Sequence, residues 1–159
     1  MRLNLCCGFK PLEDFLNVDI MDCAHILPNL FKGKDFVQWD LNKRPWPWPD
    51  DSCDVIVMRD GLEHLSGGTW LDVMNELWRL MQPLGQLVLQ VPDAAKHTAF
   101  RDPTHQMFFT RGSFDYLDPS TELGKGYFHY TPFKWKIERE DITPDGRINI
   151  VLKKWAKGN

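Results

Sequence analysis

Long apolar segments are absent from this sequence of 159 residues. No apolar run reaches the roughly 18 residues that a membrane-spanning helix needs. The chain passes from Met1 and Arg2 straight into Leu3-Asn4-Leu5, without the apolar core of a signal peptide. We therefore expect a cytoplasmic protein with no membrane partner.

Cysteine is scarce, and basic charge is not in excess. The spacing of the cysteines matches neither a zinc-binding motif nor the disulfide framework of a small secreted protein. They are Cys6, Cys7, Cys23 and Cys53. We expect free thiols in a reducing compartment. The formal net charge is −3, so the composition carries no strong signal for nucleic-acid binding.

Short apolar segments alternate with connecting segments through the first ninety residues. They are typical of β-strands, and their ranges are 3–7, 15–20, 35–39, 54–58 and 86–91. Apolar residues at helical spacing predict one clear helix over residues 69–81, with Thr69 and Asp72 as a capping box at its start. This alternation predicts a parallel sheet flanked by helices in a single α/β domain, residues 1–159.

Two further segments have distinct patterns. The stretch Pro45-Trp46-Pro47-Trp48-Pro49 is too rich in proline for a helix or a central strand, which predicts an ordered surface loop with its rings on the core. Residues 134–155 alternate between apolar and charged side chains around Pro144-Asp145-Gly146, which predicts an antiparallel hairpin. The expected architecture is thus a mostly parallel sheet of seven strands that ends in this hairpin.

Glycine and charged residues follow four of the predicted strands. Ligands of open α/β sheets bind beyond the carboxyl ends of the strands. The residues at these ends are Gly8, Asp19, Asp40 and Arg59. A glycine lets the backbone approach a ligand closely, and a carboxylate can accept hydrogen bonds from a ribose or an adenine amino group. Each residue alone is also common in ordinary turns, but the ordered set favours a ligand site.

Five motifs occur in a characteristic order along the chain. They are Asn4-Leu5-Cys6-Cys7-Gly8, Leu16-Asn17-Val18-Asp19-Ile20, the segment 46–56, Leu62-Glu63-His64-Leu65 and the helix end 76–85. Over roughly residues 3–92 the chain resembles the class I S-adenosylmethionine (SAM)-dependent methyltransferases, in a small bacterial or phage-type form. The resemblance implies that the predicted sheet is Rossmann-like. It implies SAM as cofactor and S-adenosylhomocysteine (SAH) as product. It also implies a cofactor-binding half at residues 3–92 and a substrate side at residues 93–133.

The resemblance further implies roles for individual residues. Gly8 and its neighbours would lie against the methionine part of the cofactor, Asp19 would bind the ribose, and Asp40 with Leu41 would contact the adenine. The full set expected to bind the cofactor is Cys6, Cys7, Gly8, Asp19, Ile20, Asp40, Leu41, Met58 and Arg59.

The loop after Gly8 departs from the family pattern. Phe9, Lys10 and Pro11 stand where further glycines are usual, and Asp19 follows Gly8 too closely for a full first helix. The departure keeps a second reading open, a degenerate SAM-binding partner subunit without catalysis. A third reading, a nucleotide-binding module of another class, is disfavoured by the Leu62-Glu63-His64-Leu65 motif.

Three residues are candidates for catalysis of methyl transfer to an oxygen or nitrogen of an unidentified acceptor. His64 has a pKa suited to a general base, but it can equally shape the turn after the fourth strand. Asp102 and His105 can form a carboxylate–imidazole pair, or His105 can satisfy backbone groups in a turn. His97, His105 and His129 lack the spacing of metal ligands, so we predict no metal.

Aromatic residues are concentrated between positions 127 and 135. They can form the core of the hairpin edge or hold a substrate. Because the chain carries little that covers an active site, we also expect a homodimer or a macromolecular acceptor to exclude water.

Overall fold

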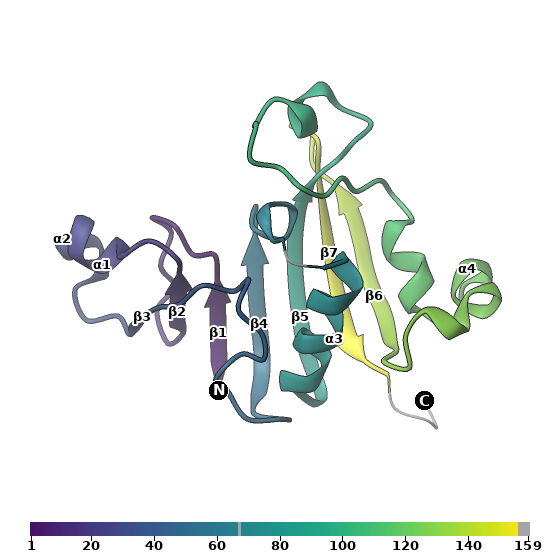
Figure 1. The fold of residues 1–159 in the computed structure, drawn as a ribbon, viewed down its shortest axis with the longest axis horizontal. Helices are drawn as coiled ribbons and strands as arrows, with labels where there is room; N and C mark the ends of the chain where they lie inside the picture. Colours follow the sequence, from purple (N-terminus) through teal and green to yellow (C-terminus); the bar gives the residue numbers. More distant parts are fainter. Residues whose placement is uncertain (67, 156–159) are drawn as a thin grey trace.

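The computed structural model describes residues 1–66 and 68–155, which form a seven-stranded sheet in the order β3-β2-β1-β4-β5-β7-β6 (Figure 1). The first five strands are parallel, β7 is antiparallel to β5, and β6 is antiparallel to β7. The strands are β1 (Arg2–Leu5), β2 (Leu16–Asp19), β3 (Phe36–Gln38), β4 (Cys53–Arg59), β5 (Met81–Pro92), β6 (Trp135–Ile142) and β7 (Arg147–Lys154). The predicted Rossmann-like sheet with an antiparallel hairpin is confirmed.

The helices are few and mostly short. The α-helices are α1 (Cys23–Ile26), α2 (Pro28–Phe31), α3 (Trp70–Leu80) and α4 (Glu122–Gly126). The 3-10 helices are η1 (Leu62–His64), η2 (His97–Phe100), η3 (Ser113–Leu117) and η4 (Phe128–Tyr130). The predicted helix over 69–81 corresponds to α3, and the Asp72 carboxylate accepts a hydrogen bond from the Thr69 amide, 2.7 Å away. Its apolar stripe, which includes Met74 and Leu77, is buried against the sheet.

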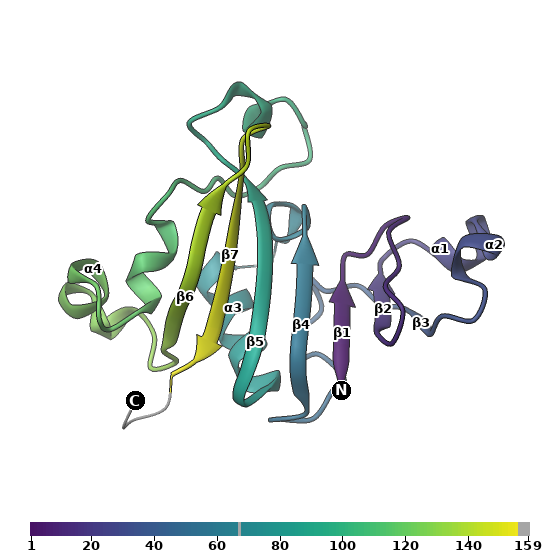
Figure 2. The same cartoon turned by 180° about the vertical axis from the view of Figure 1, so that it is seen from behind.

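Only one face of the hairpin side of the sheet carries a helix. Figure 1 shows α3 over β5, whereas Figure 2 shows the opposite face of β4, β5, β7 and β6 without any helix of the described residues. Along β5, Leu87 and Leu89 are fully buried while Gln86 is exposed. The described helices therefore flank this part of the sheet on one face, and the opposite face of β5 is partly exposed to solvent, as antiparallel pairing permits.

The strand predicted over 86–91 begins earlier, at Met81. Met81 pairs with Cys53 and Gln86 pairs with Val55, so residues 82–85 bulge out of the ladder. Leu84 takes a left-handed conformation with φ of +68°. A Cβ at Gly85 would lie 2.4 Å from the Met81 sulfur. The glycine thus permits α3 to pass into β5 without an intervening loop.

A buried asparagine pair takes the place of a helix between β1 and β2. Asn4 Nδ2 donates to Asn17 Oδ1 at 2.8 Å, and Asn17 is fully buried. Asn17 Oδ1 also accepts from the Leu12 amide at 2.8 Å, and its Nδ2 donates to the carbonyls of Leu12, Phe15 and Asp35. Because every polar atom of this side chain is satisfied, one residue holds the short loop.

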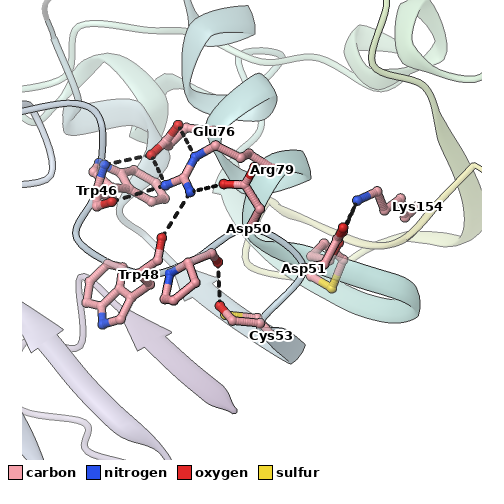
Figure 3. A network of polar contacts seen from close by, with 11 residues as sticks. Trp46, Trp48, Asp50, Asp51, Cys53, Glu76, Arg79 and Lys154 are labelled. Carbon is pink, nitrogen blue, oxygen red and sulfur yellow. Dashed lines mark hydrogen bonds and ion pairs between the residues drawn. The ribbon is translucent and has the colours of Figure 1, made fainter.

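The proline–tryptophan loop packs on the core, as predicted. Trp46 and Trp48 are 2% and 9% exposed. The Arg79 guanidinium donates to the carbonyls of both tryptophans and to the carboxylates of Glu76 and Asp50 (Figure 3). Glu76 accepts in return from the Trp46 amide at 2.6 Å. All donors of Arg79 are used, which ties the loop to α3.

No helix in the described part of the chain is long and apolar enough to cross a membrane.

Candidate functional site

The carboxyl ends of β1 and β2 are joined through Asp19. Its Oδ2 accepts from the Gly8 amide at 2.8 Å, and its Oδ1 accepts from the Met21 amide at 3.0 Å. The residue is 7% exposed. Each carboxylate oxygen keeps a second lone pair, so Asp19 can still accept from a ribose hydroxyl while it shapes the loop after Gly8.

Apolar side chains surround this edge of the sheet. Phe9, Ile20 and Met21 are 44%, 57% and 45% exposed. An apolar rim beside a carboxylate suits a ligand with a flat ring and a ribose. Asp40 lies two residues beyond the end of β3, where its Oδ1 accepts from the Asn42 amide at 3.0 Å.

Several residues expected to contact the cofactor have side chains directed inward. Met58 and Leu41 belong to the core and are 0% and 3% exposed. Cys7 packs with Cys23 in a small cluster, and burial raises the pKa of the Cys7 thiol to about 12. These residues therefore offer a ligand mainly their backbone. Arg59 is exposed and lines a shallow groove on the helix-free face of the sheet.

The ends of β1 and β4 approach each other closely. A Cβ at Gly61 would lie 2.5 Å from the Cβ of Cys6, so only glycine fits there. Burial, and then the charge of Asp19, raise the pKa of the Cys6 thiol. We infer that Cys6 is a packing residue whose neutral thiol fills the space beside Gly61.

Asp60 connects the cofactor edge to the hairpin. Its Oδ1 accepts from Arg147 Nε at 2.9 Å, and its Oδ2 lies 4.0 Å from Lys10 Nζ. Asp60 itself has φ of +50°, a conformation that non-glycine residues rarely take. The sequence pattern contained no signal for this ion pair, because Arg147 lies on β7, far along the chain.

A cavity of about 570 Å³ lies beyond the ends of β4 and β5. Its lining is mostly polar, and all three predicted catalytic residues belong to it. The lining includes Asp60, Glu63, His64, Arg101, Asp102, His105 and Arg147. The fold therefore brings together residues from three separate segments of the sequence, 60–64, 101–105 and 145–147.

The backbone of Glu63 fastens the second segment to the first. Its carbonyl accepts from the amides of Gln106 and Met107 at 2.7 and 3.1 Å. A bridge between Asp93 and Phe109 closes the base of the segment that carries His105. The segment thus folds back over η1, and His105 lies beside Glu63 and His64.

Asp102 pairs with a different partner from the one predicted. Its Oδ1 accepts from the Thr104 hydroxyl at 2.7 Å, and Thr104 Oγ1 lies 2.9 Å from Nδ1 of His64. Among the described residues no hydrogen bond or ion pair joins the Asp102 carboxylate to the His105 ring. Because the Thr104 proton is directed to Asp102, His64 Nδ1 carries the proton of its own hydrogen bond and Nε2 keeps a lone pair.

His105 contacts Ala99 and Glu63 instead. Its Nδ1 lies 2.6 Å from the Ala99 carbonyl, which can only accept, so Nδ1 is protonated. Its Nε2 lies 4.0 Å from Glu63 Oε1, and the rings of His64 and His105 lie 4.7 Å apart. Glu63 is 1% exposed, and burial raises the pKa of its carboxyl to about 7. The sequence motif contained Glu63 but gave no reason to assign it a role.

Comparison with known proteins finds a family model and solved structures that are similar to this chain. Residues 11–89 match the family described as a methyltransferase domain. A SAM-dependent methyltransferase from Archaeoglobus fulgidus is 16% identical in sequence, with a TM-score of 0.66. The alignment covers 96% of this chain and 85% of the Archaeoglobus chain. A SAM-dependent methyltransferase from Aquifex aeolicus is 15% identical, with a TM-score of 0.65 over 97% of this chain and 81% of the Aquifex chain. The YcgJ protein from Bacillus subtilis is 14% identical with a TM-score of 0.65, covering 98% and 92%. No curated protein matches the sequence.

Proposed function

We propose that this chain is a class I SAM-dependent methyltransferase that moves the SAM methyl group to an oxygen or nitrogen of a polar acceptor. Residues 11–89 match a methyltransferase domain, and the fold is similar to that of solved SAM-dependent methyltransferases. The acceptor would enter the cavity over β4 and β5. SAM is the cofactor of this family and fold, and SAH is the product that remains. In the proposed arrangement the cofactor lies at the ends of β1 to β4, against Gly8, Asp19 and Asp40.

The observation that carries the proposal is the position of the cavity. Asp60 lines it and lies 4.0 Å from Lys10, two residues beyond Gly8 in the cofactor loop. A methyl group delivered at the ends of β1 and β4 would therefore point toward the cavity. Methyl transfer is an in-line displacement on an activated carbon, so alignment and exclusion of water are the main tasks of the protein.

The lining of the cavity supports an acceptor that loses a proton on transfer. His64 and His105 each keep a lone pair on Nε2 when neutral, because their Nδ1 atoms are held by Thr104 and Ala99. Either ring can take a proton from an O–H or N–H group. Arg101 and Arg147 add positive charge to the same lining.

Two measurements test the proposal. Calorimetry should show binding of SAM and SAH but not of NAD, because the site lacks a glycine-rich dinucleotide loop. Transfer of labelled methyl from SAM into fractionated small-molecule and macromolecular pools should then reveal an acceptor. The variant His105→Ala should lose transfer while it retains SAH binding. Binding of NAD in preference to SAH would refute the assignment.

A catalytically degenerate partner subunit is the second candidate. The loop after Gly8 has no helix, and the Asp19 carboxylate is already engaged by two backbone amides. Such a subunit would bind SAH yet transfer no methyl group to any pool. Supplying a second purified acceptor pool would not produce methyl transfer. Adding the catalytic partner subunit would produce it.

We also propose a single domain that functions in the cytoplasm, either as a homodimer, which we favour, or on a macromolecular or carrier-bound acceptor. All four cysteines are free, which suits a reducing compartment. Tyr127, Phe128 and Tyr130 are 40%, 66% and 47% exposed, and Tyr130 stacks on Tyr116. Exposed aromatics of this kind usually mark a contact. Sedimentation at micromolar concentration tests the dimer, and a monomer that methylates a free small metabolite would contradict it.

A further inference from the structure

Glu63, His64 and His105 form a compact cluster of potential metal ligands in the wall of the cavity. One donor atom from each lies within 4.8 Å of the others. Two imidazoles and one carboxylate are a donor set that proteins use for catalytic zinc and for other divalent transition metals. The cluster was hidden in the sequence because η1 supplies two of the donors and the segment folded over it supplies the third.

The hydrogen bonds around the two imidazoles resemble those of metal ligands. A ligating histidine usually donates its other ring N–H to a carbonyl, carboxylate or hydroxyl, which fixes the tautomer and the ring orientation. His105 Nδ1 donates to the Ala99 carbonyl at 2.6 Å, and His64 Nδ1 donates to Thr104, which in turn donates to Asp102. Both rings therefore have an unprotonated Nε2 available for a ligand.

The third donor has an unsatisfied atom. Glu63 is 1% exposed, and its Oε2 is buried without a hydrogen-bond partner among the described residues. Within residues 1–66 and 68–155, the one cationic side chain within 4.0 Å of its carboxylate is His105, when that ring is protonated. Burial of a carboxylate oxygen without a partner is costly. A bound cation would supply the missing partner.

We propose that Glu63, His64 and His105 bind one divalent transition-metal ion, with Zn²⁺ as the first probe. Ligand bonds of about 2.0–2.2 Å require the three donors to draw closer by on the order of 1 Å. Glu63 is buried on one side of the site, whereas Asp102 and Thr104 on the other side are exposed. All three donors line the cavity, so the remaining coordination positions of the metal would open to it. This assignment replaces the expectation of no metal, which considered spacing along the chain alone.

A metal at this position would define the acceptor more closely, and that part rests on the proposed function. An acceptor hydroxyl that coordinates the ion loses its proton more readily. The oxygen then attacks the methyl carbon as the carbon–sulfur bond of SAM breaks and SAH leaves. The proton passes to solvent and not to His64 or His105, because the metal then occupies the Nε2 lone pairs that act as the base in the metal-free site. The favoured acceptor is thus an alcohol or another hydroxyl compound with an oxygen ligand for the metal.

Metal binding by the full chain tests the site without any acceptor. After treatment with a chelator, calorimetry with Zn²⁺ should give one ion per chain. The variants Glu63→Gln, His64→Ala and His105→Ala should each weaken binding at least tenfold. His97→Ala and His129→Ala, exposed histidines outside the cluster, should leave it unchanged. Equal binding by all five variants would overturn the proposal.

Cobalt provides the second readout. Bound Co²⁺ should give visible bands of nitrogen and oxygen ligands and no thiolate charge-transfer band, because no cysteine belongs to the cluster. A thiolate band that disappears in Cys7→Ser would place the ion at the cysteines and refute the site. Binding of SAH is measured on the same samples. SAH binding without stoichiometric metal overturns only the metal site, whereas metal binding without SAH binding overturns only the proposed function.

Discussion

The hydroxyl oxygen of Thr104 lies 2.9 Å from Nδ1 of His64, a residue 40 positions earlier in the chain. The same hydroxyl donates to Asp102 at 2.7 Å. This contact links the segment after β5 to the turn after β4, and it fixes which nitrogen of His64 faces the cavity unprotonated.

Replacement of Thr104 by valine should release the ring of His64. In the wild type, nitrogen-detected NMR of the imidazole at a pH where it is neutral should show a proton on Nδ1. In Thr104→Val we expect a mixture of tautomers, because valine has the same shape and no hydrogen-bonding atom. Thr104→Ser keeps the hydroxyl and should keep the tautomer. A wild-type ring protonated on Nε2 would contradict the assignment.

Asp19→Ala should weaken SAH binding at least tenfold. Charge-assisted hydrogen bonds contribute roughly 1.5–3 kcal/mol each, and Asp19 is expected to make them with the ribose. Because Asp19 also holds the Gly8 and Met21 amides, an SAH analogue without ribose hydroxyls serves as the control. Calorimetry on both proteins with both ligands completes a double-mutant cycle. If the two losses simply add, Asp19 shapes the loop and does not contact the ribose.

Arg79→Met should destabilise the fold by about 2–4 kcal/mol, because it leaves Glu76 and two backbone carbonyls without their partner. The Glu76 side chain is 11% exposed, so water cannot fully replace the guanidinium. Asp50→Asn is the matched control. The Asp50 side chain is 74% exposed, and its ion pair should contribute about 1 kcal/mol or less. Urea unfolding measures the free energy of unfolding of both variants. Equal losses would show that the buried Glu76 network does not account for the destabilisation by Arg79→Met.

Asp118→Asn should reduce stability at neutral pH and make little difference in strong acid. Burial alone would raise the pKa of the Asp118 carboxyl, but hydrogen bonds from Ser120 and the Ile137 amide, with Lys136 at 3.4 Å, hold the pKa below its usual value. A lowered folded-state pKa stabilises the protein above the unfolded pKa of about 3.9. This contribution disappears as the pH falls through the folded-state pKa.

Asp115 provides a control of opposite sign. Burial, and then the charge of Asp118, raise the pKa of the Asp115 carboxyl. Its ionisation therefore opposes folding, and the cost grows as the pH rises through the raised pKa. Asp115→Asn should increase stability at neutral pH. Urea unfolding of both variants at about pH 3 and pH 7, either side of the carboxyl range, separates the two. Parallel pH profiles would refute the assignment.

Local pattern alone was sufficient for most of the fold. The period-two and apolar segments indicated all seven strands within a few residues, and the 3.6-residue period with Thr69 and Asp72 indicated α3. These features depend on neighbours along the chain, because strand and helix periodicities are local. The bulge at residues 82–85 escaped this reasoning, since it depends on how Cys53 and Val55 pair with β5.

The candidate site divides in the same way. Strand ends are local features, so Gly8, Asp19 and Asp40 could be selected from the sequence, and the contact of Gly8 with Asp19 is now visible. The cluster of Glu63, His64 and His105 could not be selected from the sequence. The carbonyl of Glu63 has to bind the amides of Gln106 and Met107 before His105 approaches His64. Sequence determined which groups are present and which elements carry them. Tertiary structure alone decided that Thr104 meets His64 and that His105 faces a buried carboxylate, since the distances between such groups depend on how distant segments pack.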